Sequence, residues 1–205
     1  MNQLRIYPTS INQRFIDQAA EALRRGQIII YPTDTLYALG CDALNQQAID
    51  RLCRLKGINT QKNTLSIVCA DISMASRYAR IDNRAFDILR RYLPGPYTFL
   101  LPASNALPKV FKGRRIVGIR VPANPIDQAL STALDGPILS TSIPTDGLSE
   151  EEITYPDEIY LRFESKDVDL LIDGGHGSDR LSTVVDLTDS TSPEIIRQGA
   201  ADFNS

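Results

Sequence analysis

The sequence has little of the residues on which much metal and nucleophile chemistry depends. His176 is the only histidine in the 205-residue chain, so a multi-histidine metal site and a histidine relay are both excluded. The cysteines are odd in number, widely spaced and set in apolar contexts, which favours neither a disulfide framework nor a metal site. We therefore interpret Cys41, Cys53 and Cys69 as thiols packed in the core.

Long apolar runs and targeting signals are also absent. No segment approaches the roughly 20 consecutive apolar residues that a membrane helix needs, so we expect no membrane partner. The first residues, MNQLRIYPTS, lack the basic and apolar regions of a signal peptide, and the expected location is the cytoplasm. A formal net charge of −3 argues against nucleic-acid binding by the whole surface, although it is compatible with a local basic patch.

Several common enzyme motifs are missing as well. The sequence contains no phosphate-binding Gly-x4-Gly-Lys-Ser/Thr loop, no Gly-x-Gly-x-x-Gly fingerprint after an early strand and no Gly-x-Ser-x-Gly nucleophile elbow. It also has no internal repeat and no linker rich in proline and serine. We therefore expect one domain, over residues 1–205.

The apolar pattern of the chain alternates between strands and helices. Apolar residues recur at helical spacing after Ser10 and after Asn45, which we expect to cap the first two helices. Further helices are predicted at 73–78, 83–92 and 126–134. Strands are predicted around 4–7, 27–31, 64–69, 97–102, 116–122, 137–141, 169–175, 182–187 and 194–199. Some strands follow one another without a helix, so we predict an α/β fold with a twisted mixed sheet and flanking helices.

Polar clusters follow several of the predicted strands. The first is YPTDTLYALG at 31–40, and the others are STS at 140–142, DGGHGSDRLST at 173–183 and the arginine of IRQG. In open α/β sheets, ligands bind beyond strand ends, where hydroxyls, backbone amides and cations converge. Each cluster alone is better explained by turns and helix caps. Together they favour a site for an anionic or zwitterionic small molecule, with Lys56, Arg120 and Arg197 as candidate cations.

The acidic residues in these clusters raise a second hypothesis, a magnesium site. Asp34, Asp173 and Asp186 carry oxygen ligands of the kind that magnesium prefers. Carboxylates are common in turns for structural reasons, so we assign no metal ligand among them.

Read in order, the motifs resemble those of the YrdC/YciO superfamily, and especially its YciO branch, over nearly the full chain. They are YPTDTLYALG, RLKG, PGPYTFLLP, GIRVPANP, ILSTS and DGGHGSDRLSTVVDL followed by IIRQG. The family is known for making threonylcarbamoyl-adenylate from ATP, L-threonine and bicarbonate, for the threonylcarbamoyladenosine modification of tRNA. The resemblance implies a YrdC-like fold and a nucleotidyltransferase of this type.

The resemblance also implies roles for individual side chains. Lys56 is the implied catalytic residue, and ATP is the implied co-substrate, accompanied by Mg²⁺. The residues implied to bind the nucleotide are Lys56, Ser142 and Arg197. The residues implied to bind L-threonine are Thr35, Arg120, Thr141 and Ser182.

The sequence departs from the family pattern at two positions. Ile58 stands where the Lys-x-Arg motif of the family has its arginine, so one expected cation is replaced by an apolar side chain. Pro144 stands where the Ser-x-Asn motif has its asparagine, which removes a side-chain amide and a backbone donor. Both losses concern implied nucleotide contacts, so we expect weak or altered synthase activity.

The alternative is a non-catalytic protein of the YciO type that keeps the cleft and binds double-stranded RNA, tRNA or the ribosome. The candidate RNA-binding residues are Lys109, Lys112, Arg114 and Arg115, and other basic candidates are Arg51, Arg54, Lys56 and Lys62. A basic run is more often a solvated surface than an RNA site, so this interpretation stays the alternative.

Overall fold

The first long helix shows how local hydrogen bonds set the boundaries of an element. α1 (Gln13–Arg24) begins after Asn12, whose side chain accepts a hydrogen bond from the amide of Arg14 at 3.1 Å. The predicted cap at Ser10 is therefore wrong, because the Ser10 amide donates to the Tyr7 carbonyl in a separate bridge. The predicted cap at Asn45 is confirmed, since its side chain accepts from two amides of the next helix.

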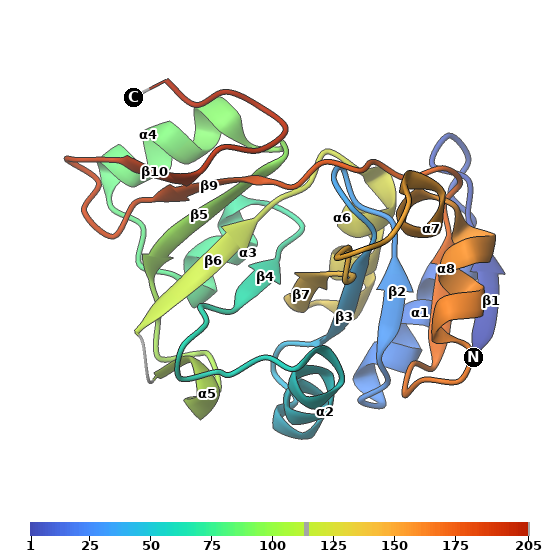
Figure 1. Cartoon of the computed structure of the whole chain (residues 1–205). Coiled ribbons are helices and arrows are strands. Elements are labelled where there is room, and N and C mark those ends of the chain that lie inside the picture. The colour runs from blue at the N-terminus through green and yellow to red at the C-terminus, as the bar shows by residue number, and fades with distance from the viewer. Residues whose placement is uncertain (113–114, 205) are drawn as a thin grey trace.

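The computed structural model describes residues 1–112 and 115–204, and Figure 1 shows how the elements are arranged. The strands are β1 (Asn2–Arg5), β2 (Ile29–Tyr31), β3 (Ala38–Asp42), β4 (Ser66–Val68), β5 (Tyr97–Pro102), β6 (Ile116–Arg120), β7 (Ile138–Ser142), β8 (Leu170–Asp173), β9 (Thr183–Asp186) and β10 (Glu194–Arg197). The helices are α1, α2 (Gln46–Lys56), α3 (Ile72–Tyr78), α4 (Asn83–Tyr92), α5 (Lys109–Lys112), α6 (Pro125–Leu134), α7 (Glu150–Thr154) and α8 (Pro156–Phe163).

All ten strands belong to one sheet, in the order β1-β8-β2-β3-β7-β4-β6-β5-β9-β10. The sheet is mixed, because β1, β8 and β2 run parallel to one another whereas β3 and β7 are antiparallel to their neighbours. The predicted twisted mixed sheet with flanking helices is thus confirmed. The two edge strands, β1 and β10, lie near the two chain ends, at opposite sides of the molecule (Figure 1).

Two apolar clusters pack on the sheet. One contains buried side chains of α1 and α6 together with Ile29 and Tyr31 of β2. The larger one contains Ile28 and Ile30 together with side chains of α2, α3 and α4. Because alternate side chains of a strand point to opposite faces, β2 is buried on both sides, as its continuous apolar run predicts.

The three cysteines are free and buried, which confirms their interpretation as core thiols. Burial raises the pKa of the Cys69 thiol to about 12. No helix in the described ranges is long and apolar enough to cross a membrane.

Candidate functional site

A cleft of about 590 Å³ opens among the central strands, α2 and the segment that follows α2. All seven residues that the family resemblance implied line it, although they come from six separate parts of the chain. They are Thr35, Lys56, Arg120, Thr141, Ser142, Ser182 and Arg197. The fold therefore brings together the polar clusters that the sequence scatters over more than 160 positions.

The register of neighbouring strands builds the floor of this cleft. Gly118 of β6 lies opposite Ser66 of β4 and Leu100 of β5. A Cβ atom on Gly118 would lie 2.3 Å from Ser66 Oγ and 3.0 Å from Thr98 Cγ2. Glycine is therefore the residue that lets these two hydroxyl side chains approach each other. Arg120, two residues further along β6, points to the same side of the sheet.

Arg120 is tied to the loop that follows β2. Its Nη2 donates to Asp34 Oδ1 and to Thr35 Oγ1, both at 2.9 Å. Thr33 Oγ1 lies 2.9 Å from Thr35 Oγ1 and donates to the Leu36 carbonyl at 2.8 Å. Each side chain of the Arg120–Asp34 ion pair is only 10% exposed. The pair thus holds a guanidinium and a hydroxyl together at the wall of the cleft.

A second cation of the cleft, Arg197, comes from β10, near the C-terminal end of the described residues. Arg197 donates to the main-chain carbonyl of Ser182 through Nε at 3.2 Å and through Nη2 at 2.9 Å. Its Nη2 also lies 3.2 Å from Ser182 Oγ, which in turn lies 2.9 Å from Thr98 Oγ1. These partners are neutral, and no ion pair of Arg197 occurs within the described ranges, so its charge is available to an anionic ligand.

Lys56 is the last residue of α2, directly before Gly57, which ends the helix with a φ of 72°. Burial lowers the pKa of Lys56, and the positive charge of Arg162 lowers it further, whereas Asp146 raises it. No carboxylate within ion-pair distance of Lys56 is found in residues 1–112 and 115–204. The site therefore contains a half-buried ammonium group without a counter-charge in contact.

The two departures from the family pattern have different surroundings. Ile58 lines the cleft and also packs against the larger apolar cluster. Pro144 is exposed and does not line the cleft, and its carbonyl accepts a hydrogen bond from Arg162 Nη2 at 2.9 Å. Of the two substitutions, Ile58 is the one whose side chain faces the ligand space.

The acidic residues considered for magnesium do not share a site. Asp34 pairs with Arg120, whereas Asp173 pairs with Arg5 at 2.7 Å. Asp186 accepts a hydrogen bond from the amide two residues further on. No group of three or more His, Cys, Asp or Glu side chains suited to a metal ion occurs in the part of the chain that the structure describes.

The basic residues considered for RNA are only partly within the described structure. Lys109 and Arg115 are exposed, whereas Arg114 and the side chain of Lys112 lie outside the described residues. The charge of Arg51 is not available to RNA, because its guanidinium donates to Asp167 Oδ2 at 2.7 Å and to a second aspartate, Asp169. Of the four candidate RNA-binding residues, Lys109 and Arg115 are therefore the two whose exposure the structure describes.

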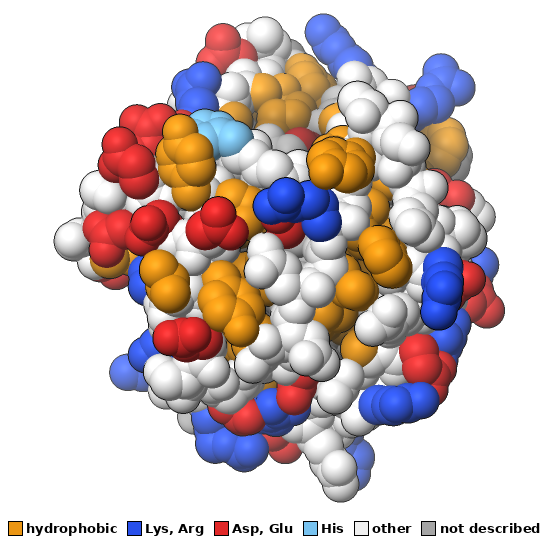
Figure 2. All heavy atoms as spheres, turned by 90° about the vertical axis from the view of Figure 1, so that its right-hand side faces the viewer, with side chains coloured by type: hydrophobic (Ala, Val, Ile, Leu, Met, Phe, Trp, Pro, Cys, Tyr) orange, Lys and Arg blue, Asp and Glu red, His pale blue; other side chains and the backbone are white. Residues whose placement is uncertain are grey.

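The single histidine lies away from the cleft, on the face that Figure 2 shows. His176 packs edge to face against Tyr155, with ring centroids 4.7 Å apart. Acidic side chains gather beside the histidine (Figure 2), since α7 begins with three glutamates and α8 with Asp157 and Glu158. These surroundings do not favour a nucleic-acid backbone.

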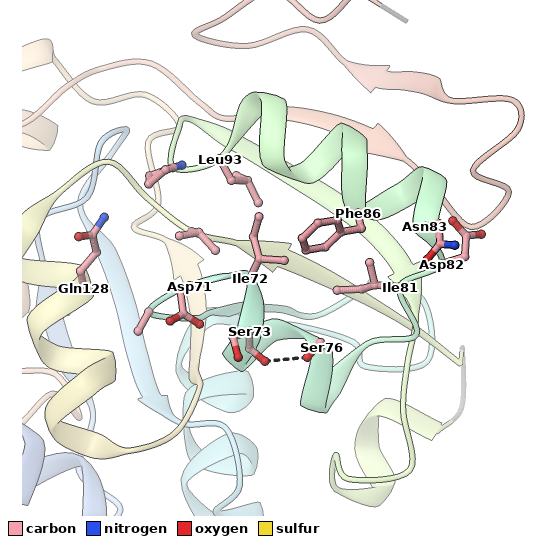
Figure 3. Close-up of a pocket in the computed structure, with 13 residues that line it drawn as sticks. Asp71, Ile72, Ser73, Ser76, Ile81, Asp82, Asn83, Phe86, Leu93 and Gln128 are labelled. Atoms are coloured by element: carbon pink, nitrogen blue, oxygen red, sulfur yellow. Dashed lines mark hydrogen bonds between the residues drawn. The ribbon is translucent and has the colours of Figure 1, made fainter.

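A larger cavity of about 820 Å³ lies between α3, α4 and α6, and Ile72, Phe86 and Leu93 face into it (Figure 3). Its acidic side chains, Asp71 and Asp82, are occupied as the N-caps of α3 and α4. None of the residues implied by the sequence lines it. The smaller, polar cleft is therefore the candidate functional site.

Some residues of the site were not predicted. Ser66 and Thr98 lie within predicted strands, where a hydroxyl between apolar neighbours was the only available signal. Asp127 does not line the cleft, but it is fully buried in α6 and interacts electrostatically with the cleft residue Arg120. Its signal was an acidic residue next to apolar ones in a predicted helix.

Residues 21–199 match the Sua5/YciO/YrdC family model, described as "Telomere recombination". The chain belongs to this family. The Escherichia coli member YciO, called an uncharacterised protein, is 43% identical over 199 residues, which are 96% of this chain and 95% of YciO. The crystal structure of YciO has a TM-score of 0.89 and covers 98% of both chains at 41% identity.

Other members of the Sua5/YciO/YrdC family carry names that state an activity or a ligand. The threonylcarbamoyl-AMP synthase of Halorhodospira halophila is 36% identical over 129 residues, 62% of this chain and 67% of that enzyme. P. abyssi Sua5, whose crystal structure is complexed with L-threonine, has a TM-score of 0.84 at 30% identity. That match covers 97% of this chain and 58% of Sua5.

Proposed function

We propose that this cleft binds ATP and L-threonine and forms threonylcarbamoyl-AMP from them and bicarbonate, as an intermediate of tRNA modification. The observation that carries the proposal is that the residues implied to bind both substrates line one cleft. The relatives named for threonylcarbamoyl-AMP synthesis and for L-threonine support the same substrates.

Two groups of cleft residues suit the two substrates. The Arg120 guanidinium and the Thr35 hydroxyl offer a charge and a hydrogen-bonding partner for the carboxylate and hydroxyl of L-threonine. Lys56 and Arg197, which have no carboxylate in contact within the described ranges, suit the phosphates of ATP. The Ser182 hydroxyl bonds to both Arg197 and Thr98, and we assign it to the L-threonine site.

The proposed reaction begins with the L-threonine amino group and bicarbonate, which form a carbamate with loss of water. An oxygen of the carbamate then attacks the α-phosphorus of ATP, and pyrophosphate leaves. None of the described residues that line the cleft is a carboxylate or a histidine. The protein would therefore act mainly by positioning the substrates and by balancing charge on the phosphates.

Mg²⁺ fits this site only as a companion of the nucleotide. The described lining offers hydroxyls but no carboxylate, and magnesium in nucleotide sites is usually held by phosphates together with a few protein oxygens. On β7, the hydroxyls of Ser140, Thr141 and Ser142 line the cleft and would be the candidate protein ligands. The ion would supply charge neutralisation at the phosphates.

A pyrophosphate-release assay tests the proposal. ATP, bicarbonate and L-threonine are supplied together and then omitted one at a time, and we expect release only when all three are present. Lys56→Ala should abolish it. Lys62→Ala is the matched control, because Lys62 is exposed and does not line the cleft. An absence of threonine-dependent release at high protein concentration would instead favour the RNA-binding alternative.

A further inference from the structure

Asp127 is buried without any of the partners that a buried carboxyl normally has. It lies in the first turn of α6 with 0% of its surface exposed. Neither of its carboxyl oxygens has a hydrogen-bond partner among the described residues. The adjacent Ile126 is also fully buried and joins an apolar cluster. A buried polar group that makes no hydrogen bond is uncommon in a folded protein and requires an explanation.

The second observation concerns Arg120 of β6. The start of α6 lies beside the segment after β6, because Gln128, the residue after Asp127, donates to the carbonyl of Pro122 at 3.1 Å, and Arg120 acts electrostatically on Asp127. The Nη2 of Arg120 is bonded to Asp34 and Thr35, but its Nε is buried and has no partner among the described residues. A buried donor of the cleft residue Arg120 and the buried acid that interacts with it electrostatically thus both lack a partner among the described residues. Arg120 is also the cation that the proposed L-threonine site uses.

The charged and titratable groups around Asp127 come from three parts of the chain. They are Arg120 of β6, Asp34 of the loop after β2, and Tyr31 of β2. Tyr31 donates its hydroxyl hydrogen to Ser140 Oγ at 2.8 Å. α1 also packs on α6, but the residues that α1 buries are apolar.

Burial, together with these neighbours, shifts the pKa of Asp127. Burial raises the pKa of Asp127 well above its ordinary value, Arg120 opposes that rise, and Asp34 adds to it. With Asp127 uncharged, Arg120 and Asp34 balance each other. Ionised Asp127 would leave this group with a net negative charge beside the cleft, and its carboxylate would be a new partner for Arg120.

We propose that Asp127 is a proton-linked positioning residue of the L-threonine site. When Asp127 is uncharged, the Arg120 guanidinium binds Asp34, Thr35 and a carboxylate ligand. When Asp127 is ionised, its carboxylate competes with that ligand for the guanidinium. The inference rests on the proposed function, because it takes the ligand carboxylate to bind at Arg120.

The coupling between the ligand and the proton has a definite sign. A carboxylate at Arg120 favours uncharged Asp127, so ligand binding takes up a proton wherever Asp127 is partly ionised. By linkage, the affinity falls by up to about tenfold for each pH unit above the pKa of Asp127. Asp127→Asn keeps the shape and removes the ionisation, and this pH dependence disappears with it.

Calorimetric titrations over a range of pH test the inference, with L-threonine and 3-hydroxybutyrate as probes. The second probe keeps the carboxylate, hydroxyl and methyl groups of threonine but lacks its titrating amino group. We expect both probes to bind the unaltered protein more weakly as the pH rises, and the Asp127→Asn protein to show a flatter profile. Asp135→Asn, an exposed change at the other end of α6, should keep the original profile.

The outcomes separate the two proposals. If the unaltered protein binds neither probe at any pH, the proposed function fails and this inference fails with it. If Asp127→Asn and the unaltered protein bind with the same pH profile, only the role of Asp127 is overturned. Should Asp127→Asn not fold, titrations of the unaltered protein with 3-hydroxybutyrate in buffers of different ionisation enthalpy give the proton uptake directly. No uptake at any pH would overturn the inference.

Discussion

Arg120 and Asp34 form an ion pair of 2.9 Å that joins two distant segments of the chain. The second carboxylate oxygen of Asp34 accepts a hydrogen bond from the amide of Ala123, also at 2.9 Å. Asp34 therefore fastens the loop after β2 to the segment after β6. The same contacts fix the Arg120 side chain at the wall of the cleft, so stability and ligand binding are coupled through this carboxylate.

The first prediction is that Asp34→Asn lowers both the stability and the affinity for L-threonine. Removing one charge of an ion pair that is about nine-tenths buried should lower the free energy of unfolding by about 3 kcal/mol. The freed Arg120 should also lose its fixed orientation. Chemical denaturation and calorimetric titration of the same preparation measure the two effects.

Asp169→Asn is the control for this prediction. Asp169 pairs with Arg51 at 2.8 Å, outside the cleft, and both side chains are 26% exposed. Its loss should lower the stability by about 1 kcal/mol and leave L-threonine binding unchanged. An Asp34→Asn protein that binds L-threonine as well as the Asp169→Asn protein does would contradict the coupling.

The sequence predicted the parts of the site that lie at strand ends. The fold class, most element positions and the polar clusters could be read from local patterns, whereas the roles of the seven site residues are what the family resemblance implied. Their convergence followed from the tendency of strand ends in an open α/β sheet to share one ligand site. Hence Thr35 and Arg197 were predicted as parts of one site although they are 162 positions apart in the sequence.

The features that depend on register could not be predicted. The approach of Ser66 to Thr98 over Gly118 requires knowing which strands are neighbours and how they are aligned. Predicting the burial of Asp127 required knowing which face of α6 packs into the core.

α7 was missed although Ser149 and Glu152 form a capping box, because the five-residue helix is too short for a helical period to be recognised.

The second prediction concerns Gly118. Gly118→Ala would place a Cβ atom 2.3 Å from Ser66 Oγ, so the strands or side chains must shift. Such overpacking should lower the free energy of unfolding by about 1–3 kcal/mol. Ser66→Gly removes the opposing side chain, and Gly118→Ala should cost less in that background. Additive losses in denaturation experiments on the four proteins would show that Ser66 is not the obstacle.

The third prediction tests the missing nucleotide cation. Ile58 lines the cleft at the family arginine position, and a charge-assisted contact to phosphate contributes about 1.5–3 kcal/mol. Ile58→Arg should therefore tighten ATP binding by roughly ten- to a hundredfold. Gln61→Arg adds the same charge at an exposed position that does not line the cleft, and it should leave ATP binding unchanged.

The contrary outcome for Ile58→Arg has a structural cause. Ile58 also packs against the larger apolar cluster. If the arginine side chain stays in that position, it disrupts the apolar packing and does not reach the phosphates. A folded Ile58→Arg protein that binds ATP no better than the Gln61→Arg protein would show that this position does not supply a phosphate contact.

The fourth prediction addresses the RNA-binding alternative. If Lys109 and Arg115, both exposed, contact duplex RNA, the logarithm of the affinity should fall linearly with the logarithm of salt concentration. Charge reversal at both positions should then make that slope shallower. Filter-binding or fluorescence titrations at several salt concentrations give the slope. An equal slope for both proteins would remove these residues as the RNA site.

The last prediction concerns the charge of Lys56. Burial lowers the pKa of this side chain, so Lys56 loses its proton at a lower pH than an exposed lysine does. If the ammonium group binds the ATP phosphates, ATP affinity should decline as the pH rises through that lowered pKa. Replacing Lys56 with arginine keeps the position charged throughout this range, and we expect the affinity of Lys56→Arg to stay nearly constant.

ATP titrations of both proteins from neutral to alkaline pH measure this difference. The decline for the unaltered protein should approach ten- to a hundredfold once Lys56 is neutral, because a charge-assisted contact is worth about 1.5–3 kcal/mol. Lys62→Arg, at an exposed position outside the cleft lining, should follow the unaltered protein. Parallel pH profiles for Lys56→Arg and the unaltered protein would mean that the Lys56 ammonium group does not bind the ATP phosphates. Arg197 would then be the cation that binds them.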